Sequence, residues 1–156
     1  CVNKVIDQVT KFREIEGSNT KKDLLDNLEK LDSFKVNVES FSKDHRAQVE
    51  EDLKSKIDNL NVELDYGRLE QELFYYLEKI DINEEIVRLN SHLKFFSDVL
   101  NNNEVEKGKK LGFICQEIGR EINTIGSKAN NSSIQSNVVE MKTLLEKLKE
   151  QSLNIL

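Results

Sequence analysis

The chain has 156 residues, of which one third are charged, and it carries a net charge of −6 with no proline, six glycines and no tryptophan. The acidic excess argues against a general nucleic-acid-binding protein, which normally has a basic excess. Because helix-breaking residues are scarce and strand-like alternation is missing, the sequence predicts an all-α fold. An apolar run of membrane-spanning length is absent, so we expect no membrane partner.

The first sixty residues predict two long helices. One spans about residues 2–41 and the other about residues 45–59, and we expect them to form a long helical hairpin, an extended arm over residues 1–62. Gly17 does not force a break, since a single glycine costs only about 1 kcal/mol in a helix. The apolar residues recur at spacings of three and four: Val2, Val5, Val9, Phe12, Leu24, Leu28, Leu31 and Val38.

The rest of the chain, residues 63–156, predicts a bundle of about three further helices. Asp81 and Glu84 have the spacing of a capping box, in which two side chains satisfy backbone amides where a helix restarts. Another helix covers about residues 107–128, and Ser132 begins a second motif of the same spacing. The last helix has the four-and-three spacing of a coiled-coil seam. Its apolar residues are Ile134, Val138, Met141, Leu145 and Leu148.

Two of the predicted helices carry a polar stripe next to their apolar face. With 100° per residue, the members of each stripe fall within about 100° of one another. Each stripe borders the apolar face, so packing the two helices together brings both stripes to the edge of one interface. The stripes consist of Glu85, Arg88 and His92 on one helix, and of Glu117, Arg120, Glu121 and Lys128 on the other.

These side chains are of the types that cleave a phosphodiester bond. The carboxylates and His92 can bind a divalent ion that activates water, or His92 can instead transfer a proton. The arginines and Lys128 can neutralise charge that develops on phosphate. Residues 107–128 contain five basic and two acidic residues, and this local net charge of +3 favours a polyanion. The alternative is a solvated face with ordinary surface ion pairs three residues apart, Glu85 with Arg88 and Glu117 with Arg120.

The remaining reactive residues indicate no further site. Cys1 and Cys115 give no disulfide framework and no metal-type spacing, which predicts a reducing, cytoplasmic compartment. Cys115 has no activating partner near it in sequence, so we expect a small, partly buried helix residue. The aromatic pairs Tyr75–Tyr76 and Phe95–Phe96 fit stacking on bases, but such pairs belong more often to a core. The start at Cys1 instead of Met indicates a piece of a longer protein.

Three motifs identify a family resemblance. They are E-E-x-x-R-L-x-S-H from Glu84, Q-E-x-x-R-E-x-N-T-x-G-S-K-A from Gln116, and E-x-K-x-x-x-E-K-x-x-E-Q from Glu140. Upstream, the stretch REIEG (residues 13–17) is similar to an R-x-x-E-G element of the same family. With these motifs, essentially the whole chain resembles the C-terminal region of the YicC-like endoribonucleases.

The resemblance implies a bacterial, cytoplasmic endoribonuclease that cleaves single-stranded or structured RNA. It further implies dependence on a divalent metal ion (Mg²⁺ or Mn²⁺), a ring-like homo-oligomer that is a hexamer, and an N-terminal domain upstream that this chain lacks. Carried over to matching positions, it implies Glu117, Glu121, His92 and Glu85 as catalytic residues and metal ligands, and Arg88, Arg120, Lys128 and Arg13 as RNA-binding residues. Glu16 matches a further functional position without an assigned role.

Two departures from the family pattern and one alternative function complete the expectations. Gly112 stands where members usually have an acidic residue, and Gly119 where they usually have asparagine or a similar residue. The lost carboxylate either weakens a metal site or alters packing. The alternative is a helical oligomerisation or RNA-clamping module without chemistry of its own. Stripes that meet within the coordination span of a metal favour the enzyme, whereas carboxylates on unrelated faces favour the clamp.

Overall fold

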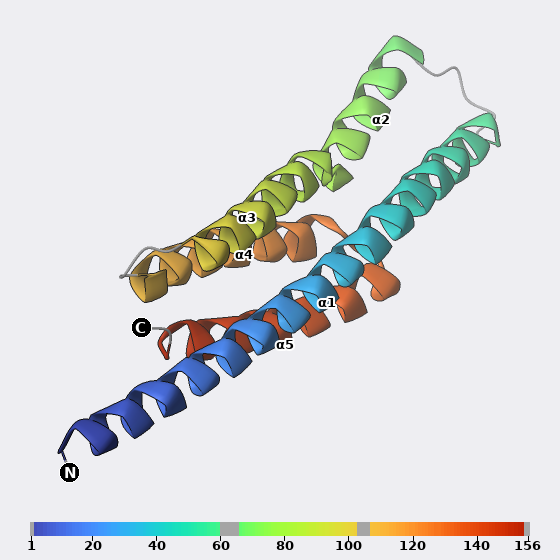
Figure 1. The fold of residues 1–156 in the computed structure, drawn as a ribbon. Coiled ribbons are helices and arrows are strands. Elements are labelled where there is room, and N and C mark those ends of the chain that lie inside the picture. The colour runs from blue at the N-terminus through green and yellow to red at the C-terminus, as the bar shows by residue number, and fades with distance from the viewer. Residues whose placement is uncertain (1, 60–65, 103–106, 155–156) are drawn as a thin grey trace.

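The computed structural model describes residues 2–59, 66–102 and 107–154, with side chains from residue 6 onward. Within these ranges the regular structure is entirely α-helical, which confirms the all-α prediction (Figure 1). None of the helices described there has the length and apolarity needed to cross a lipid bilayer. The helices are α1 (Val2–Asp58), α2 (Tyr66–Ile80), α3 (Asn83–Asn101), α4 (Lys107–Lys128) and α5 (Ser132–Ser152).

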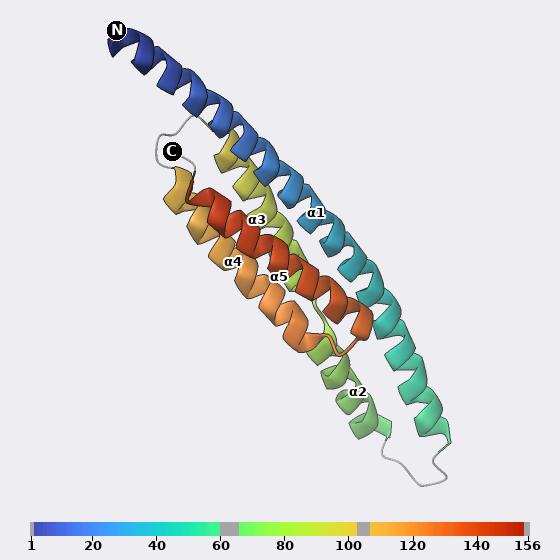
Figure 2. The same ribbon diagram turned by 90° about the horizontal axis from the view of Figure 1, so that it is seen from below.

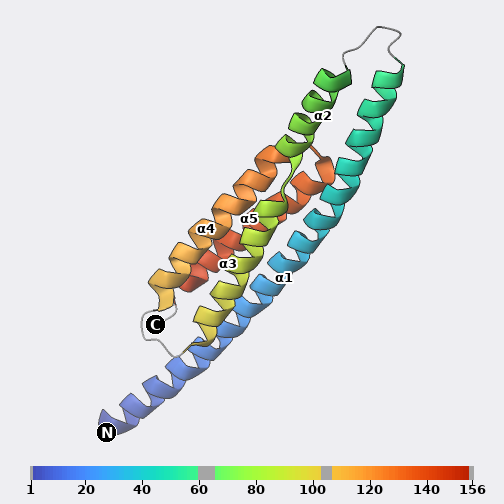
Figure 3. The same ribbon diagram turned by 90° about the horizontal axis from the view of Figure 1, so that it is seen from above.

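The first helix, α1, runs without a break along the whole length of the molecule (Figure 1). The predicted break between residues 41 and 45 is therefore wrong. No proline or glycine stands in this stretch to interrupt the backbone hydrogen bonds, and a merely polar Ser-Lys-Asp sequence does not end a helix. The long hairpin is made instead by α1 and α2, which pack against each other as an antiparallel pair (Figure 3).

One hydrophobic core joins the middle of α1 to α3, α4 and α5. In Figure 2, α5 lies between α1 and α4, and α3 closes the bundle behind them. The apolar faces predicted for α3 and α4 are buried in this core, and so is the predicted seam of α5. The contribution of α1 is a stripe at helical spacing: Leu24, Leu28, Leu31 and Val38.

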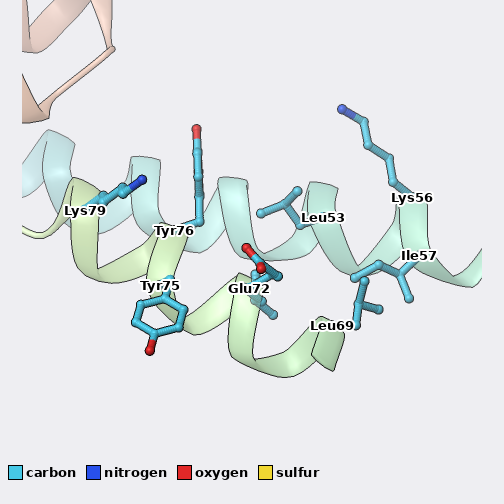
Figure 4. A pocket seen from close by; sticks show the side chains of 9 residues that line it. Leu53, Lys56, Ile57, Leu69, Glu72, Tyr75, Tyr76 and Lys79 are labelled. Atoms are coloured by element: carbon cyan, nitrogen blue, oxygen red, sulfur yellow. The ribbon is translucent and has the colours of Figure 1, made fainter. Parts of the chain in front are cut away.

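The two ends of α1 extend beyond this core. At the N-terminal end, the apolar side chains of Ile6, Val9 and Phe12 are at least half exposed, so their helical spacing does not mark core positions within the described chain. At the other end, α1 and α2 line an open apolar groove of about 420 Å³. Leu69 of α2 faces Ile57 of α1 across this groove (Figure 4).

The junction between α2 and α3 lies where the sequence predicts a helix restart. The Asp81 carboxylate accepts a hydrogen bond from the backbone N–H of Asn83 through Oδ1, at 2.8 Å. Glu84 does not complete the predicted box, because its carboxylate pairs with Arg88 one turn ahead. Asp81 therefore satisfies one backbone N–H at the start of α3, whose cap residue Ile82 has no side-chain hydrogen bond. The other Asp81 oxygen stays available for a partner from a different helix.

The start of α5 lies one residue earlier than predicted. Asn131 is the cap, and its side chain accepts hydrogen bonds from the N–H groups of Ser133 and Ile134. The expected box from Ser132 is wrong, since the Gln135 amide instead donates to two carbonyl oxygens at the end of α4, 2.6 and 2.7 Å away. This side chain ties the end of α4 to the start of α5.

Candidate active site at the α3–α4 interface

The helices α3 and α4 pack antiparallel and place the two polar stripes along one interface. At one end, Lys107 Nζ lies 3.4 Å from the carbonyl oxygen of Leu100, and at the other end Lys128 contacts Glu85. Both helices rise by the same distance per residue. The residue seven positions after Glu85 in α3 and the residue seven positions before Lys128 in α4 are therefore also at the same height. We infer that His92 of α3 lies level with Glu121 of α4.

The Glu85–Lys128 pair is the most strongly desolvated ionic contact of this interface. Glu85 is 4% exposed, and its Oε1 lies 2.7 Å from Lys128 Nζ. The same ammonium donates to the main-chain oxygen of Asp81 at 3.1 Å. Glu85 Oε2 is buried and has no hydrogen-bond partner within the described part of the chain. Leaving such an oxygen unsatisfied costs about 1–3 kcal/mol, so it is a place for a bound donor or cation.

Glu121 and His92 are the two remaining titratable members of the stripes near this pair. Glu121 is 8% exposed although it carries a carboxylate, and His92 is half-buried. Neither side chain forms a hydrogen bond or ion pair with another residue that the structure describes. Carboxylates are rarely buried without a partner. The Glu121 oxygens follow this rule, because the residue is largely covered but its carboxylate still reaches solvent, unlike Glu85 Oε2.

The other charged members of the stripes form local pairs at the surface. Arg120 Nη1 lies 3.0 Å from Glu117 Oε1 one turn away, and the Arg120 side chain is largely exposed. Arg88 pairs with Glu84 and not with Glu85. Such pairs contribute only a few tenths of a kcal/mol. Both guanidinium groups can therefore exchange their carboxylate partner for a phosphate at little cost.

The four predicted metal ligands do not come together as one donor set. Among residues 2–59, 66–102 and 107–154, no group of three or more histidine, cysteine, aspartate or glutamate side chains is arranged to hold a metal ion. Glu85 is bound by Lys128, and Glu117 lies near the surface beside Arg120. The donors of a single chain thus do not fit a metal centre, and the divalent ion stays a prediction.

Arg13 and Glu16 lie at the opposite end of the bundle. They line a cavity of about 870 Å³ together with Lys107 and Leu100, at the C-terminal end of α3. From Glu85 to Leu100, α3 rises about 22 Å at 1.5 Å per residue. The structure therefore does not bring Arg13 to the other predicted RNA-binding residues within one chain.

Comparison with known proteins decides the family. The model for the C-terminal part of endoribonuclease YicC-like proteins matches residues 36–156. The chain belongs to the YicC-like endoribonuclease family. It is 36% identical over 159 aligned residues to a probable endoribonuclease YicC of Clostridioides difficile, and 32% identical over 154 residues to that of Haemophilus influenzae. These alignments cover 97% and 96% of this chain but 53% of each relative, so the chain spans about half of their length.

The two departures from the YicC-like pattern have different structural settings. A Cβ built on Gly119 lies 3.1 Å from Leu145 Cδ2, so the absent side chain lets α4 approach α5 closely. A Cβ on Gly112 meets no atom within 4 Å. Packing therefore accounts for the glycine at position 119, and nothing in the structure explains the one at position 112.

The sequence did not reveal every polar contact of this YicC-like site. Arg46 Nη1 lies 2.5 Å from Asp81 Oδ2, and sequence alone assigned Arg46 no role. The two residues are 35 positions apart and belong to no common motif, so no local signal pairs them. The prediction that the aromatic pairs belong to the core holds for Phe96 alone, which is buried. Phe95, Tyr75 and Tyr76 are exposed.

Proposed function

We propose that this chain is the part of an endoribonuclease that cleaves RNA phosphodiester bonds, with its active site along the α3–α4 interface. Membership in the family supports the reaction class. One observation carries the location: the buried Glu85 carboxylate has a bare oxygen, and Glu121 and His92 lie on the same interface. Groups that are desolvated without a protein partner are typical of catalytic sites.

The charged and titratable side chains of the interface can be assigned roles in this reaction. The guanidinium groups of Arg88 and Arg120 and the ammonium of Lys128 bind the phosphate and neutralise the charge that develops on it. His92 and Glu121 transfer protons: one accepts the proton of the attacking hydroxyl group, and the other donates a proton to the leaving oxygen. The ribose 2′-hydroxyl or a water molecule is the nucleophile, and the first restricts the reaction to RNA.

No step of this reaction is assigned to a metal ion, because the described histidine, cysteine, aspartate and glutamate side chains form no group of three that could hold one. A requirement for Mg²⁺ or Mn²⁺, a cytoplasmic location and a hexameric ring stay predictions. Exposed apolar residues on the N-terminal part of α1 and on α2 support assembly with further protein surface. The relatives are about twice as long, so the complete polypeptide that contains this chain is the proper enzyme for assay.

The test is cleavage of a labelled RNA by the complete polypeptide and by the 156-residue chain, each with Mg²⁺, Mn²⁺ or a chelator. We expect His92→Ala and Glu121→Gln to lower the rate by about 10²–10⁴-fold, which is the usual contribution of proton transfer. Glu117→Gln tests the exposed carboxylate in the same assay. Glu51→Gln on the exposed side of α1, outside the family motifs, is the matched control and keeps the wild-type rate.

Two outcomes decide against this assignment. Undiminished cleavage in both His92→Ala and Glu121→Gln removes these residues from the mechanism. RNA binding without cleavage by the complete polypeptide under every ion condition supports instead the helical clamp, in which the exposed guanidinium groups bind RNA without chemistry.

A further inference from the structure

Asp81 joins helices that lie far apart in the sequence. It stands between α2 and α3, and its carboxylate accepts from Arg46 of α1 through Oδ2 and from the N–H of Asn83 through Oδ1. Its main-chain oxygen accepts from Lys128 at the end of α4. Asp81 thus connects α1, the α2–α3 junction and α4 through three hydrogen bonds.

The consequence concerns the position of the Lys128 ammonium. A lysine side chain has four rotatable carbon bonds, so a single acceptor does not fix its charge in space. Here two acceptors hold it: Glu85 Oε1 at 2.7 Å and the Asp81 carbonyl at 3.1 Å. The direction of that carbonyl is set by the two anchors on the Asp81 side chain. Lys128 is also held to one oxygen of Glu85, which leaves Oε2 bare.

The Arg46–Asp81 pair itself adds little to stability. Its side chains are 41% and 28% exposed, and ion pairs in such positions typically contribute less than about 1 kcal/mol. Loss of such a pair therefore changes the position of neighbouring groups more than it changes the free energy of unfolding. A displacement of about 1 Å at a reacting group can cost about a hundredfold in rate, so a weak contact that positions a charge has a measurable effect.

We propose that Arg46 and Asp81 are positioning residues that hold the Lys128 ammonium against Glu85, where it neutralises the charge that develops on the phosphate during cleavage. The inference rests on the proposed function for its catalytic consequence, but the positioning of Lys128 is separately measurable. Through Arg46, the long helix α1 then takes part in the α3–α4 site without touching the substrate.

The first experiment measures Lys128 directly and needs no activity. The folded protein is treated with a limiting amount of an acetylating reagent, and the acetylation rate of Lys128 relative to the exposed Lys147 is read by mass spectrometry. We expect Arg46→Met and Asp81→Asn to raise this ratio about fivefold, the effect of losing one restraining hydrogen bond. Arg46→Lys retains a charge at this position and restores part of the protection. Asp81→Asn keeps an oxygen for the Asn83 amide, so the start of α3 is preserved.

The matched control is Lys43→Met, which removes an exposed cation from α1 one turn before Arg46. We expect it to leave the Lys128 ratio and the melting temperature unchanged. An unchanged Lys128 ratio in both Arg46→Met and Asp81→Asn overturns the proposal, whatever the enzyme assay shows. A melting transition shared with the wild type verifies that each variant is folded.

The second experiment is kinetic and uses the complete polypeptide. We expect Arg46→Met to lower kcat by about 10–100-fold with KM changed less than about twofold, and Arg46→Lys to recover part of the loss. Normal kcat in Arg46→Met, alongside a strong loss in Lys128→Met, overturns the positioning role. Normal cleavage in Lys128→Met, His92→Ala and Glu121→Gln together shows instead that the proposed active site is wrong, while the acetylation ratio still decides whether Arg46 restrains Lys128.

Discussion

The α3–α4 interface and the α1–α2 arm are both antiparallel helix pairs with apolar residues at helical spacing, yet they differ in burial. α3 and α4 are covered by α1 and α5, so their apolar faces close into the core. Among the described helices, α2 packs mainly against α1. Leu77 is the buried side chain among its described residues, whereas Phe74 and Tyr75 are exposed. Two helices by themselves cannot enclose an apolar face, and a further layer is needed.

The same difference applies to charged side chains. Along the arm they form exposed pairs one turn apart, such as Lys54 with Glu50. At the α3–α4 interface, the neighbouring helices cover the edge of the core, so Glu85 is almost wholly buried and Glu121 is largely covered. In the described part of the chain, Glu85 Oε2 has neither solvent nor a hydrogen-bond partner. A carboxylate is removed from water only where helices cover it from more than one side. The bundle therefore buries charged side chains at a candidate site, whereas the charged side chains of the arm stay in solvent.

The largest expected effect compares two phenylalanines. Phe96→Ala removes a ring that is 0% exposed in the bundle, and Phe74→Ala removes one that is 62% exposed on the arm. We expect Phe96→Ala to lower the free energy of unfolding by about 3–5 kcal/mol and Phe74→Ala by less than about 1 kcal/mol. Urea denaturation followed by circular dichroism measures both. Equal losses would mean that the arm is buried against further protein surface in solution.

The next effect compares two lysines in ion pairs. Lys128→Met leaves Glu85 buried without its partner, and we expect a loss of about 2 kcal/mol, below the range for fully buried pairs because Lys128 is partly exposed. Lys54→Met breaks the exposed pair with Glu50 and should leave stability essentially unchanged, because both groups are fully solvated. The same urea series measures both variants. A loss for Lys128→Met as small as that for Lys54→Met contradicts the desolvation of Glu85.

The core also changes the chemistry of Cys115. Burial away from water raises the pKa of its thiol from 9.0 to about 11. The folded state thus holds the proton more tightly than the unfolded chain, so this contribution to stability is complete below pH 9 and is lost as the pH rises towards 11. At pH 8 we expect alkylation by iodoacetamide to be about a hundredfold slower in the folded protein than in urea. Equal rates at Cys115, read by peptide mass spectrometry, contradict its burial.

The smallest effect separates two glycines of α4. Gly112→Ala places a methyl group in open space, and we expect it to raise stability by about 0.5–1 kcal/mol through helix propensity. At Gly119 the same methyl group meets Leu145 Cδ2 at 3.1 Å, which offsets that gain. We therefore expect Gly119→Ala to be neutral or destabilising in thermal denaturation. Equal stabilisation by both changes would show that Leu145 of α5 moves aside without loss of stability.

Much of the bundle follows from local pattern. The apolar positions of α3, α4 and α5 recur at the helical period, and nearly all of them are buried as predicted. The pattern fails at the ends of α1, where Val9 and Phe12 keep the same spacing but remain exposed. The spacing of apolar residues indicates that one face of a helix is apolar, but it does not indicate whether another helix covers that face.

The candidate site shows the same division. Spacing alone placed Glu85 and Lys128 on stripes that meet, and the structure confirms their contact. Spacing also suggested a pair between Glu85 and Arg88, whereas Arg88 reaches Glu84 instead. The choice between two adjacent glutamates depends on which one the neighbouring helix has buried. Arg46 shows the limit most clearly, because its partner is brought close by the packing of α1 beside the α2–α3 junction.

The amino-acid sequence by itself determined the helical class, the apolar faces of α3 to α5, and the family, because these depend on residue type and on spacing within one helix. Tertiary structure alone decided which charged groups lose water, which lysine holds which carboxylate, and that the predicted metal ligands remain apart in one chain. Desolvation and contacts between distant residues arise only when separate helices pack together, and no local pattern records that step.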